Sequence, residues 1–217
     1  TGAEGNKEFL IAAVLNGANL LLAAFILPES RPGDPKAKLN WRQLNPLKPI
    51  LWAVSLRALL PLFAIFFILN FAANVYGTVW ALYGADTFAW NGLMVGLSLS
   101  GYGLLHAAVQ AVLPGPVTKR FGERASLLLG LGAESIGLVI AAFATQGWIV
   151  FAIMPLFALG GVGAPALQSL TTRQVGEDKQ GQLQGVLASV MSLASIFAPL
   201  FFASVYFASN TTWPGLV

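Results

Sequence analysis

Six long apolar runs follow one another along the 217 residues of the chain, separated by shorter polar connections. Each run has roughly the 17 to 25 residues that an α-helix needs to cross about 30 Å of hydrocarbon. The strict alternation typical of membrane β-barrels is absent, and a helix satisfies every backbone polar group within lipid. The pattern predicts an all-α, polytopic membrane bundle with transmembrane helices at about 8–28, 56–78, 92–113, 125–144, 147–168 and 184–207.

The composition supports this prediction and excludes several chemistries. Hydrophobic residues make up 56% of the chain and charged residues only 10%, far from the balance of soluble domains. Cysteine is absent, which excludes disulfides and thiolate sites, and the single histidine allows no histidine pair for zinc. HExxH, GxSxG and GxxxxGK[ST] motifs are also missing. We therefore expect neither an enzyme with catalytic residues nor a resident metal or cofactor.

Basic residues predict the orientation, because they accumulate in short cytoplasmic connections. All of the 12 Lys and Arg residues except Lys7 lie between or beside runs one and two, three and four, or five and six. The connections on the other side, 81–91 and 145–148, have none and are expected to face outward. The net charge of +3 is then explained by topology and by contact with anionic headgroups of the bilayer, without a nucleic-acid partner.

One connection, residues 29–50, is long, polar and rich in proline, and it predicts a linker between two groups of helices. Only one run precedes it and five follow it. Because this partition is uneven and the chain starts at Thr1 without methionine, we expect the sequence to be a fragment of a longer protein.

Two ionisable residues, His106 and Glu134, lie inside the predicted spans. A charged side chain at the centre of a membrane helix costs about 2.5 to 3.5 kcal/mol on insertion scales, so such residues usually face a cavity or a partner. At 1.5 Å per residue, Glu134 lies about 14 Å from the cytoplasmic end of its helix and His106 about 11 Å. The two residues therefore lie at similar depth on consecutive helices, with Gln110 on the same helix face as His106.

This pair has two interpretations on sequence chemistry alone. It either binds and releases protons during function, or it joins two helices by a structural hydrogen bond. Asn70 and Asn74, also four residues apart, either pack between helices or face a polar organic substrate. Gly160, Gly161 and Gly163 ahead of Pro165 predict a kink, close helix packing, or both.

The connection "GPVTKRFGERASLLLG" (115–130) resembles the signature cytoplasmic loop of the major facilitator superfamily, Gly-x-x-x-Asp-Arg-x-Gly-Arg-Arg. The matching residues are Gly115, Arg120, Gly122 and Arg124, whereas Lys119 occupies the acidic position. Four further stretches resemble the tetracycline efflux proteins, the drug:H⁺ antiporters of Gram-negative bacteria. They are "LPES" (27–30), "GLLHAAVQAVLPGPV" (103–117), "GGVGAPALQSLTTRQVGEDKQGQLQG" (160–185) and "ASIFAPL" (194–200).

This resemblance implies a major facilitator fold in which the six spans are helices six to eleven of about twelve. Residues 1–28 would be the last helix of the N-terminal half, 29–55 the central cytoplasmic loop, and 56–217 the C-terminal half without its final helix. The N-terminal half would be a missing partner from the same chain. The implied function is proton-coupled efflux of a tetracycline-type drug, as a chelate with Mg²⁺ or another divalent cation, across the bacterial inner membrane, which gives antibiotic resistance.

The resemblance also implies roles for individual residues. His106 and Glu134 would couple protons and handle the drug chelate, with Gln110, Asn70 and Asn74 also at the drug pathway. The family typically has Asp at the position of Glu134. The cytoplasmic loops that move during transport would include Gly115, Arg120, Gly122, Arg124 and Arg173. Two alternatives stay open, namely another major facilitator that exchanges a drug or solute for protons, and a scaffold or inactive fragment that does not transport.

Overall fold

The computed structural model of the protein describes residues 2–26, 52 and 55–217. The chain divides into two units, Thr1–Leu44 and Asn45–Val217, and each is described by itself. The predicted central loop, 29–55, lies almost entirely outside the described residues.

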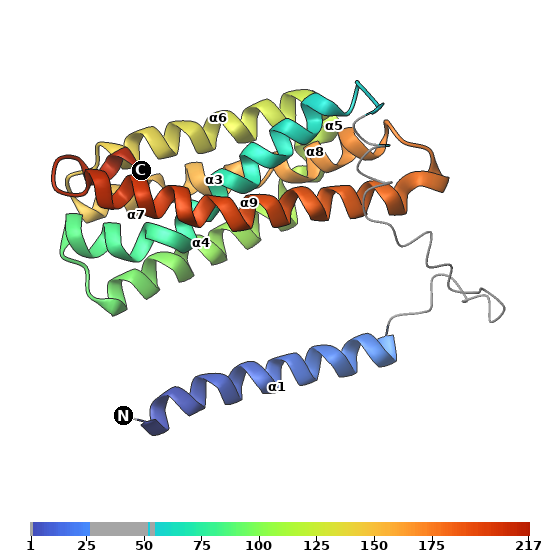
Figure 1. Ribbon diagram of the computed structural model, residues 1–217. Helices are drawn as coiled ribbons and strands as arrows, with labels where there is room; N and C mark the ends of the chain where they lie inside the picture. The colour runs from blue at the N-terminus through green and yellow to red at the C-terminus, as the bar shows by residue number, and fades with distance from the viewer. Residues whose placement is uncertain (1, 27–51, 53–54) are drawn as a thin grey trace. The chain divides into compact units, whose positions relative to one another are not determined.

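In the described residues of the first unit the chain forms the helix α1 (Gly2–Ile26), which includes the described part of the first predicted run (Figure 1). The large apolar side chains described on this helix are exposed within the unit, among them Leu20 and Phe25. Such a surface is suited to contact with lipid or with other membrane helices.

The second unit is a helical bundle. Its α-helices are α3 (Leu60–Phe88), α4 (Gly92–Val112), α5 (Pro114–Phe121), α6 (Glu123–Ala142), α7 (Gly147–Gly160), α8 (Gly163–Thr172) and α9 (Gln180–Ser209). Two 3₁₀ turns, η2 (Glu177–Lys179) and η3 (Pro214–Leu216), precede and follow α9. Five segments are long and apolar enough to cross a membrane, namely Leu60–Phe88, Gly92–Val112, Glu123–Ala142, Gly147–Thr172 and Glu177–Ser209. They confirm the last five predicted spans, and the described residues contain no strand.

One predicted boundary is wrong. The helix expected to end near residue 78 continues as α3 to Phe88, so most of the predicted outward connection 81–91 is helical. No proline interrupts this stretch, and the helix ends only where Ala89 adopts the left-handed conformation, with φ of 54°. A hydropathy pattern locates the apolar part of a helix, whereas its end depends on this backbone turn.

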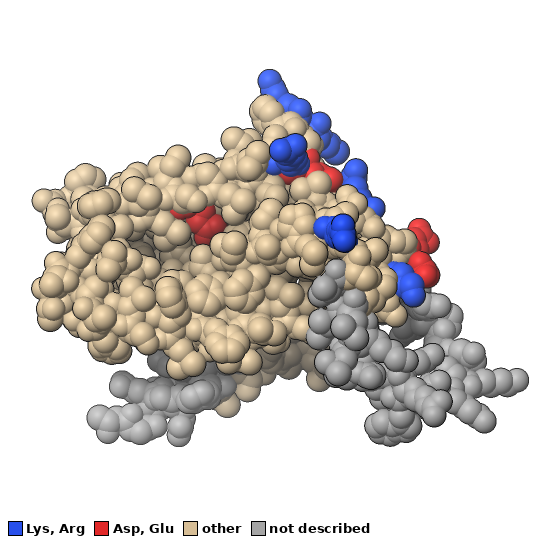
Figure 2. All heavy atoms as spheres, turned by 45° about the horizontal axis from the view of Figure 1, so that its top comes forward, with Lys and Arg blue, Asp and Glu red and all other residues tan. Residues whose placement is uncertain are grey.

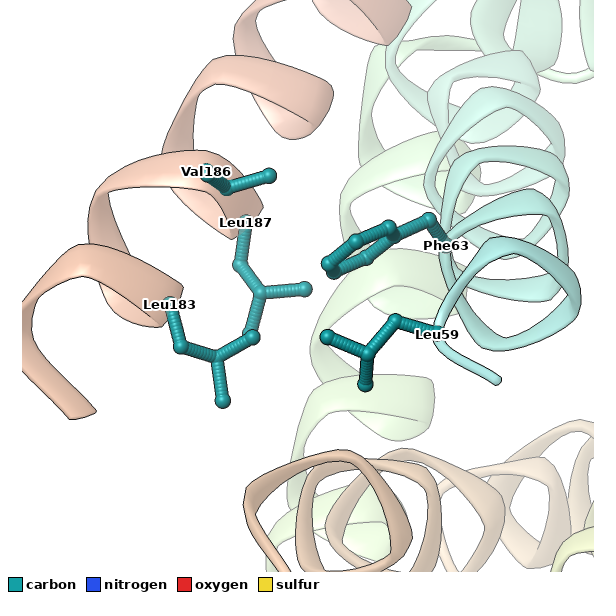
Figure 3. Close-up of a cluster of buried hydrophobic side chains, with 5 residues drawn as sticks. All are labelled: Leu59, Phe63, Leu183, Val186 and Leu187. Atoms are coloured by element: carbon teal, nitrogen blue, oxygen red, sulfur yellow. The ribbon is translucent and has the colours of Figure 1, made fainter. Parts of the chain in front are cut away.

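The core of the second unit has two parts: α6 packs against α7 and α8, and α3 packs against α9 along their length. At one end, Leu59 and Phe63 contact Leu183, Val186 and Leu187 (Figure 3). At the other end, Tyr83 lies in a cluster with Phe202 and Tyr206. The Tyr206 hydroxyl donates a hydrogen bond of 2.6 Å to Oδ2 of Asp86, which joins the two helices again near their ends. Between membrane helices such fit supplies the stability that the hydrophobic effect gives to a soluble core.

The charged residues of the bundle concentrate at one end. Figure 2 shows the Lys and Arg side chains gathered there, whereas the tan body of the bundle shows a red acidic patch and no blue side chain. This basic end contains the described residues Arg57, Lys119, Arg120, Arg124, Arg173 and Lys179. It corresponds to the side on which the sequence predicts the cytoplasm.

An aromatic cluster around Trp90 lies at the opposite end. Its ring lies 5.2 Å from that of Phe88, 5.6 Å from that of Phe151 and 6.4 Å from that of Trp80, between centroids. Gly84 leaves room for the indole, since a Cβ there would lie 2.8 Å from its Cε3 atom. The end of α3 and the beginning of α7 therefore both contact the Trp90 side chain.

Candidate functional site

The site is organised by a break in a membrane-length segment, where α7 ends at Gly160 and α8 begins at Gly163. The amides of Gly161 and Val162 donate to the carbonyl oxygens three residues earlier, at 3.0 Å each, as in a tighter 3₁₀ turn. Pro155 inside α7 removes one further backbone donor ahead of the break. The residues of the break are buried, so the helix is interrupted inside the bundle.

The glycines of the break let α6 approach backbone against backbone. A Cβ on Gly130 of α6 would lie only 2.6 Å from the amide nitrogen of Gly163 and 3.0 Å from the carbonyl oxygen of Gly160. The close packing expected from the glycine-rich sequence therefore occurs at the break between α7 and α8.

The two ionisable residues predicted inside the spans, His106 and Glu134, both lie against this break. A Cβ on Gly160 would lie 2.9 Å from Cβ and 3.0 Å from Oε2 of Glu134, which comes from α6. A Cβ on Gly161 would lie 2.6 Å from Cε1 and 3.0 Å from Nδ1 of His106, which comes from α4. Two consecutive glycines thus bring the acid and the imidazole together at one depth.

The hydrogen bonds of His106 stay on its own helix. Its Nδ1 lies 3.3 Å from the hydroxyl of Tyr102, and its Nε2 lies 3.4 Å from Nε2 of Gln110, one turn away on either side. Among the described residues, no hydrogen bond or ion pair joins His106 to Glu134. The structure therefore lacks the interhelical bond that a purely structural role of the pair would require.

Glu134 also faces open space on the side of α3. It lines a cavity of about 300 Å³ together with Ser135 and apolar side chains of α3 and α6. A second cavity of about 280 Å³ adjoins it, because Ala72 and Leu138 line both. The second cavity is bordered by the aromatic residues Tyr76, Trp80 and Tyr83. A carboxylate at the edge of apolar space can attract a cation that carries an apolar body.

Comparison with known proteins decides the family. Residues 62–217 match the Major Facilitator Superfamily. The chain belongs to this superfamily. Its members are multi-pass membrane transporters and not enzymes, so the all-α membrane bundle and the absence of an enzymatic role agree with the sequence predictions.

Several curated proteins that are similar to the chain are named tetracycline resistance proteins. The chain is 47% identical over 211 residues to the tetracycline resistance protein, class C, of Escherichia coli, covering 97% of this chain and 53% of that protein. It is 43% identical over 216 residues to the class G protein of Vibrio anguillarum, covering 100% and 55%, respectively. It is 35% identical over 219 residues to the class B protein of Escherichia coli, covering 98% and 53%. The chain therefore spans about half the length of the curated relatives it matches.

In this facilitator chain the predicted signature loop is mostly helical. Residues Pro114–Phe121 form α5, so Gly115 and Arg120 lie on a short helix, and Arg120 lies 5.7 Å over the ring of Phe121. Gly122 separates α5 from α6 with φ of 81°, a conformation that L side chains rarely adopt. Arg124 follows on α6 and is exposed.

Arg173 forms a link that the sequence did not reveal. Its guanidinium lies 2.8 Å from Oε1 of Glu123, and the hydroxyl of Ser169 donates to the same oxygen. Glu123 is the first residue of α6, whereas Ser169 and Arg173 lie at the end of α8. The signal for Glu123 was present, because it is an acid within an otherwise basic loop, but the signature motif places its acid four residues earlier.

The two asparagines of α3 do not join the site. The Asn70 amide donates to the carbonyl oxygen of Phe66 at 2.8 Å, and the Asn74 amide donates to that of Asn70 at 2.7 Å. Neither lines the two cavities beside Glu134. Among the described residues, the polar neighbours of Glu134 are instead Tyr76 and Tyr102, and those of His106 are Tyr102 and Gln110. The signal for Tyr102 was its spacing of four residues from His106.

Proposed function

We propose that this chain belongs to a proton-coupled exporter of tetracycline-type drugs in the bacterial inner membrane, and that it thereby contributes to antibiotic resistance. The drug travels as a chelate with Mg²⁺ or another divalent cation, which is part of the cargo. The proposal is supported by the names of relatives that resemble the chain over nearly its whole length. The observation that carries it is the Glu134 carboxylate, which lies beside apolar cavities without a partner among the described residues.

A carboxylate in this position can perform exchange by competition. When it is charged it attracts the cationic chelate, and when it takes up a proton that attraction is lost. The low-dielectric surroundings strengthen the difference between the two states. Binding of a proton and binding of the chelate then exclude each other at Glu134, which is the requirement for an antiporter.

His106 contributes a second polar group at the same depth. Tyr102 and Gln110 hold its ring from both sides, so its orientation is fixed relative to the break at Gly161. The adjoining cavities supply apolar surface for the body of a drug, and a facilitator alternates access by moving two halves against each other. The other half would come from the N-terminal part of the same protein, with lipid around both.

The experiment replaces the matching half of the class C relative by residues 1–217 and measures tetracycline uptake into inverted membrane vesicles under an imposed pH gradient. Two variants, Glu134→Gln and Glu134→Asp, are compared at equal expression. Unit charges about 4 Å apart attract by about 4 kcal/mol at an effective dielectric of 20, so we expect Glu134→Gln to reduce uptake at least about 100-fold.

Glu134→Asp keeps the charge and is expected to retain export. Full proton-coupled uptake by the Glu134→Gln protein would refute the proposed role of the carboxylate. A folded chimera that melts normally but carries no drug even with Glu134 present would support a scaffold instead.

A further inference from the structure

The hydroxyl of Tyr76 is buried and has no hydrogen-bond partner among the described residues. Buried polar groups are nearly always paired, because leaving one unpaired costs the free energy of its lost hydration. The only other buried side-chain polar atom in this state, within the described part of the chain, is the Thr87 hydroxyl at the end of α3. Tyr76 therefore needs an explanation in the middle of the bundle.

The ring of Tyr76 is held by aromatic neighbours. It stacks on Tyr102 with centroids 6.1 Å apart and planes inclined by 22°. Phe157 and Trp80 meet it edge-on at 5.8 Å and 5.9 Å. Contacts of this kind favour one orientation of a ring, and here they come from side chains of α3, α4 and α7.

The Glu134 carboxylate is a suitable hydrogen-bond acceptor for the Tyr76 hydroxyl. It interacts electrostatically with the hydroxyls of both Tyr76 and Tyr102. The Tyr102 hydroxyl already pairs with His106, whereas that of Tyr76 is free. Tyr76 and Glu134 also line two adjoining cavities that share Ala72 and Leu138, so an unpartnered donor and an unpartnered acceptor border neighbouring space.

The titratable groups around Glu134 come from two helices. Among the described residues they are Tyr76 of α3 and Tyr102 and His106 of α4. The break of α7 and α8 presents glycine to the carboxylate and adds no charged side chain there.

We propose that Tyr76 is a positioning residue whose hydroxyl donates a hydrogen bond to the Glu134 carboxylate when that group is charged and unliganded. The bond is released when Glu134 takes up a proton, or when the cationic chelate occupies its place. A hydrogen bond to a charged acceptor is roughly twice as strong as one between neutral groups, so the charged carboxylate gains most from it. This inference rests on the proposed function for its role in transport, but the bond itself is a property of the protein alone.

The test uses the chimera that contains residues 1–217, with Tyr76→Phe and the matched control Tyr83→Phe. Both tyrosines lie on α3, and the Tyr83 hydroxyl donates a structural hydrogen bond of 2.7 Å to the carbonyl oxygen of Ala141. The readout is the infrared carbonyl band of protonated Glu134 as a function of pH, identified by its disappearance in Glu134→Gln. This readout does not depend on transport.

We expect Tyr76→Phe to move the midpoint of the Glu134 band upward by about one pH unit, a tenfold change in proton affinity, because the charged form loses a hydrogen bond. The pH profile of export should move in the same direction. The melting temperature should stay equal or rise, because an unpaired buried hydroxyl has been removed. Tyr83→Phe should lower the melting temperature and leave the Glu134 midpoint unchanged.

An unchanged Glu134 midpoint in Tyr76→Phe overturns the inference, whatever happens to stability. Absence of export by the unmodified chimera, with a Glu134 band that still responds to Tyr76→Phe, contradicts the proposed function and leaves the hydrogen bond supported. The two proposals therefore fail separately.

Discussion

The two sides of Glu134 are built in opposite ways. Toward α7 and α8 the carboxyl lies against Gly160, in a region where backbone meets backbone at Gly130 and Gly163. Toward α3 the same side chain borders about 300 Å³ of open, mostly apolar space. One side fixes where the carboxyl is, and the other leaves it accessible to a ligand. A membrane protein can place a charge at depth when rigid packing and free space meet at one residue.

The tight side should be the most sensitive to added volume. Gly130→Ala would place its Cβ 2.6 Å from the Gly163 nitrogen, a backbone atom that cannot move alone. We expect a loss of about 1 to 3 kcal/mol in unfolding free energy, typical of overpacking, measured as a lower melting temperature in detergent. Gly132→Ala is the control, because nothing lies within 4 Å of its Cβ. Alanine favours a helix by about 1 kcal/mol over glycine, so equal melting of both variants would contradict the tight packing.

A second substitution tests how the break positions the imidazole. Gly161→Ala would bring its Cβ to 2.6 Å from Cε1 of His106, the outer part of a side chain that can shift. Because the clash can be relieved by ring displacement, we expect a smaller loss of stability than in Gly130→Ala. Export by the chimera should fall about tenfold or more, since displacement of a functional group by about 1 Å can cost 100-fold.

The control for this substitution is Gly103→Ala on α4, where nothing lies within 4 Å of the added Cβ. Normal export by Gly161→Ala would show that the position of His106 is unimportant. Tight packing at the break would then have no role in export.

The smallest effect is expected at the basic end, where side chains rather than backbones connect α6 and α8. Arg173 pairs with Glu123 but remains 72% exposed, and exposed ion pairs contribute about 0 to 1 kcal/mol. Arg173→Gln should therefore change the melting temperature little, and less still at high salt. The control is Arg124→Gln, also exposed at the basic end. A loss as large as that of Gly130→Ala would show that polar contacts stabilise the bundle as much as backbone packing does.

Sequence reasoning located the spans because apolar runs of membrane length are a strong signal, and it matched the depths of His106 and Glu134 by counting residues. It misplaced the end of α3, because hydropathy does not register the left-handed turn at Ala89. The glycines before Pro165 indicated a break, but only the structure shows that consecutive glycines receive the two ionisable side chains.

Contacts between residues on different helices could not be predicted from the sequence. Spacing along one helix revealed the Gln110 contact of His106, whereas the pairing of Glu123 with Arg173 joins residues far apart in the chain. The position of Tyr76 beside Glu134 likewise depends on how α3, α4 and α7 cross.

The aromatic cluster at the end opposite the basic residues also has a spectroscopic consequence. Trp90 contacts the rings of Phe88, Phe151 and Trp80, so its indole lies where the end of α3 meets the beginning of α7. Separation of these ends would expose the indole and alter its emission. In a variant whose other five tryptophans are replaced, Trp90 would therefore report opening at this end in time without an attached dye.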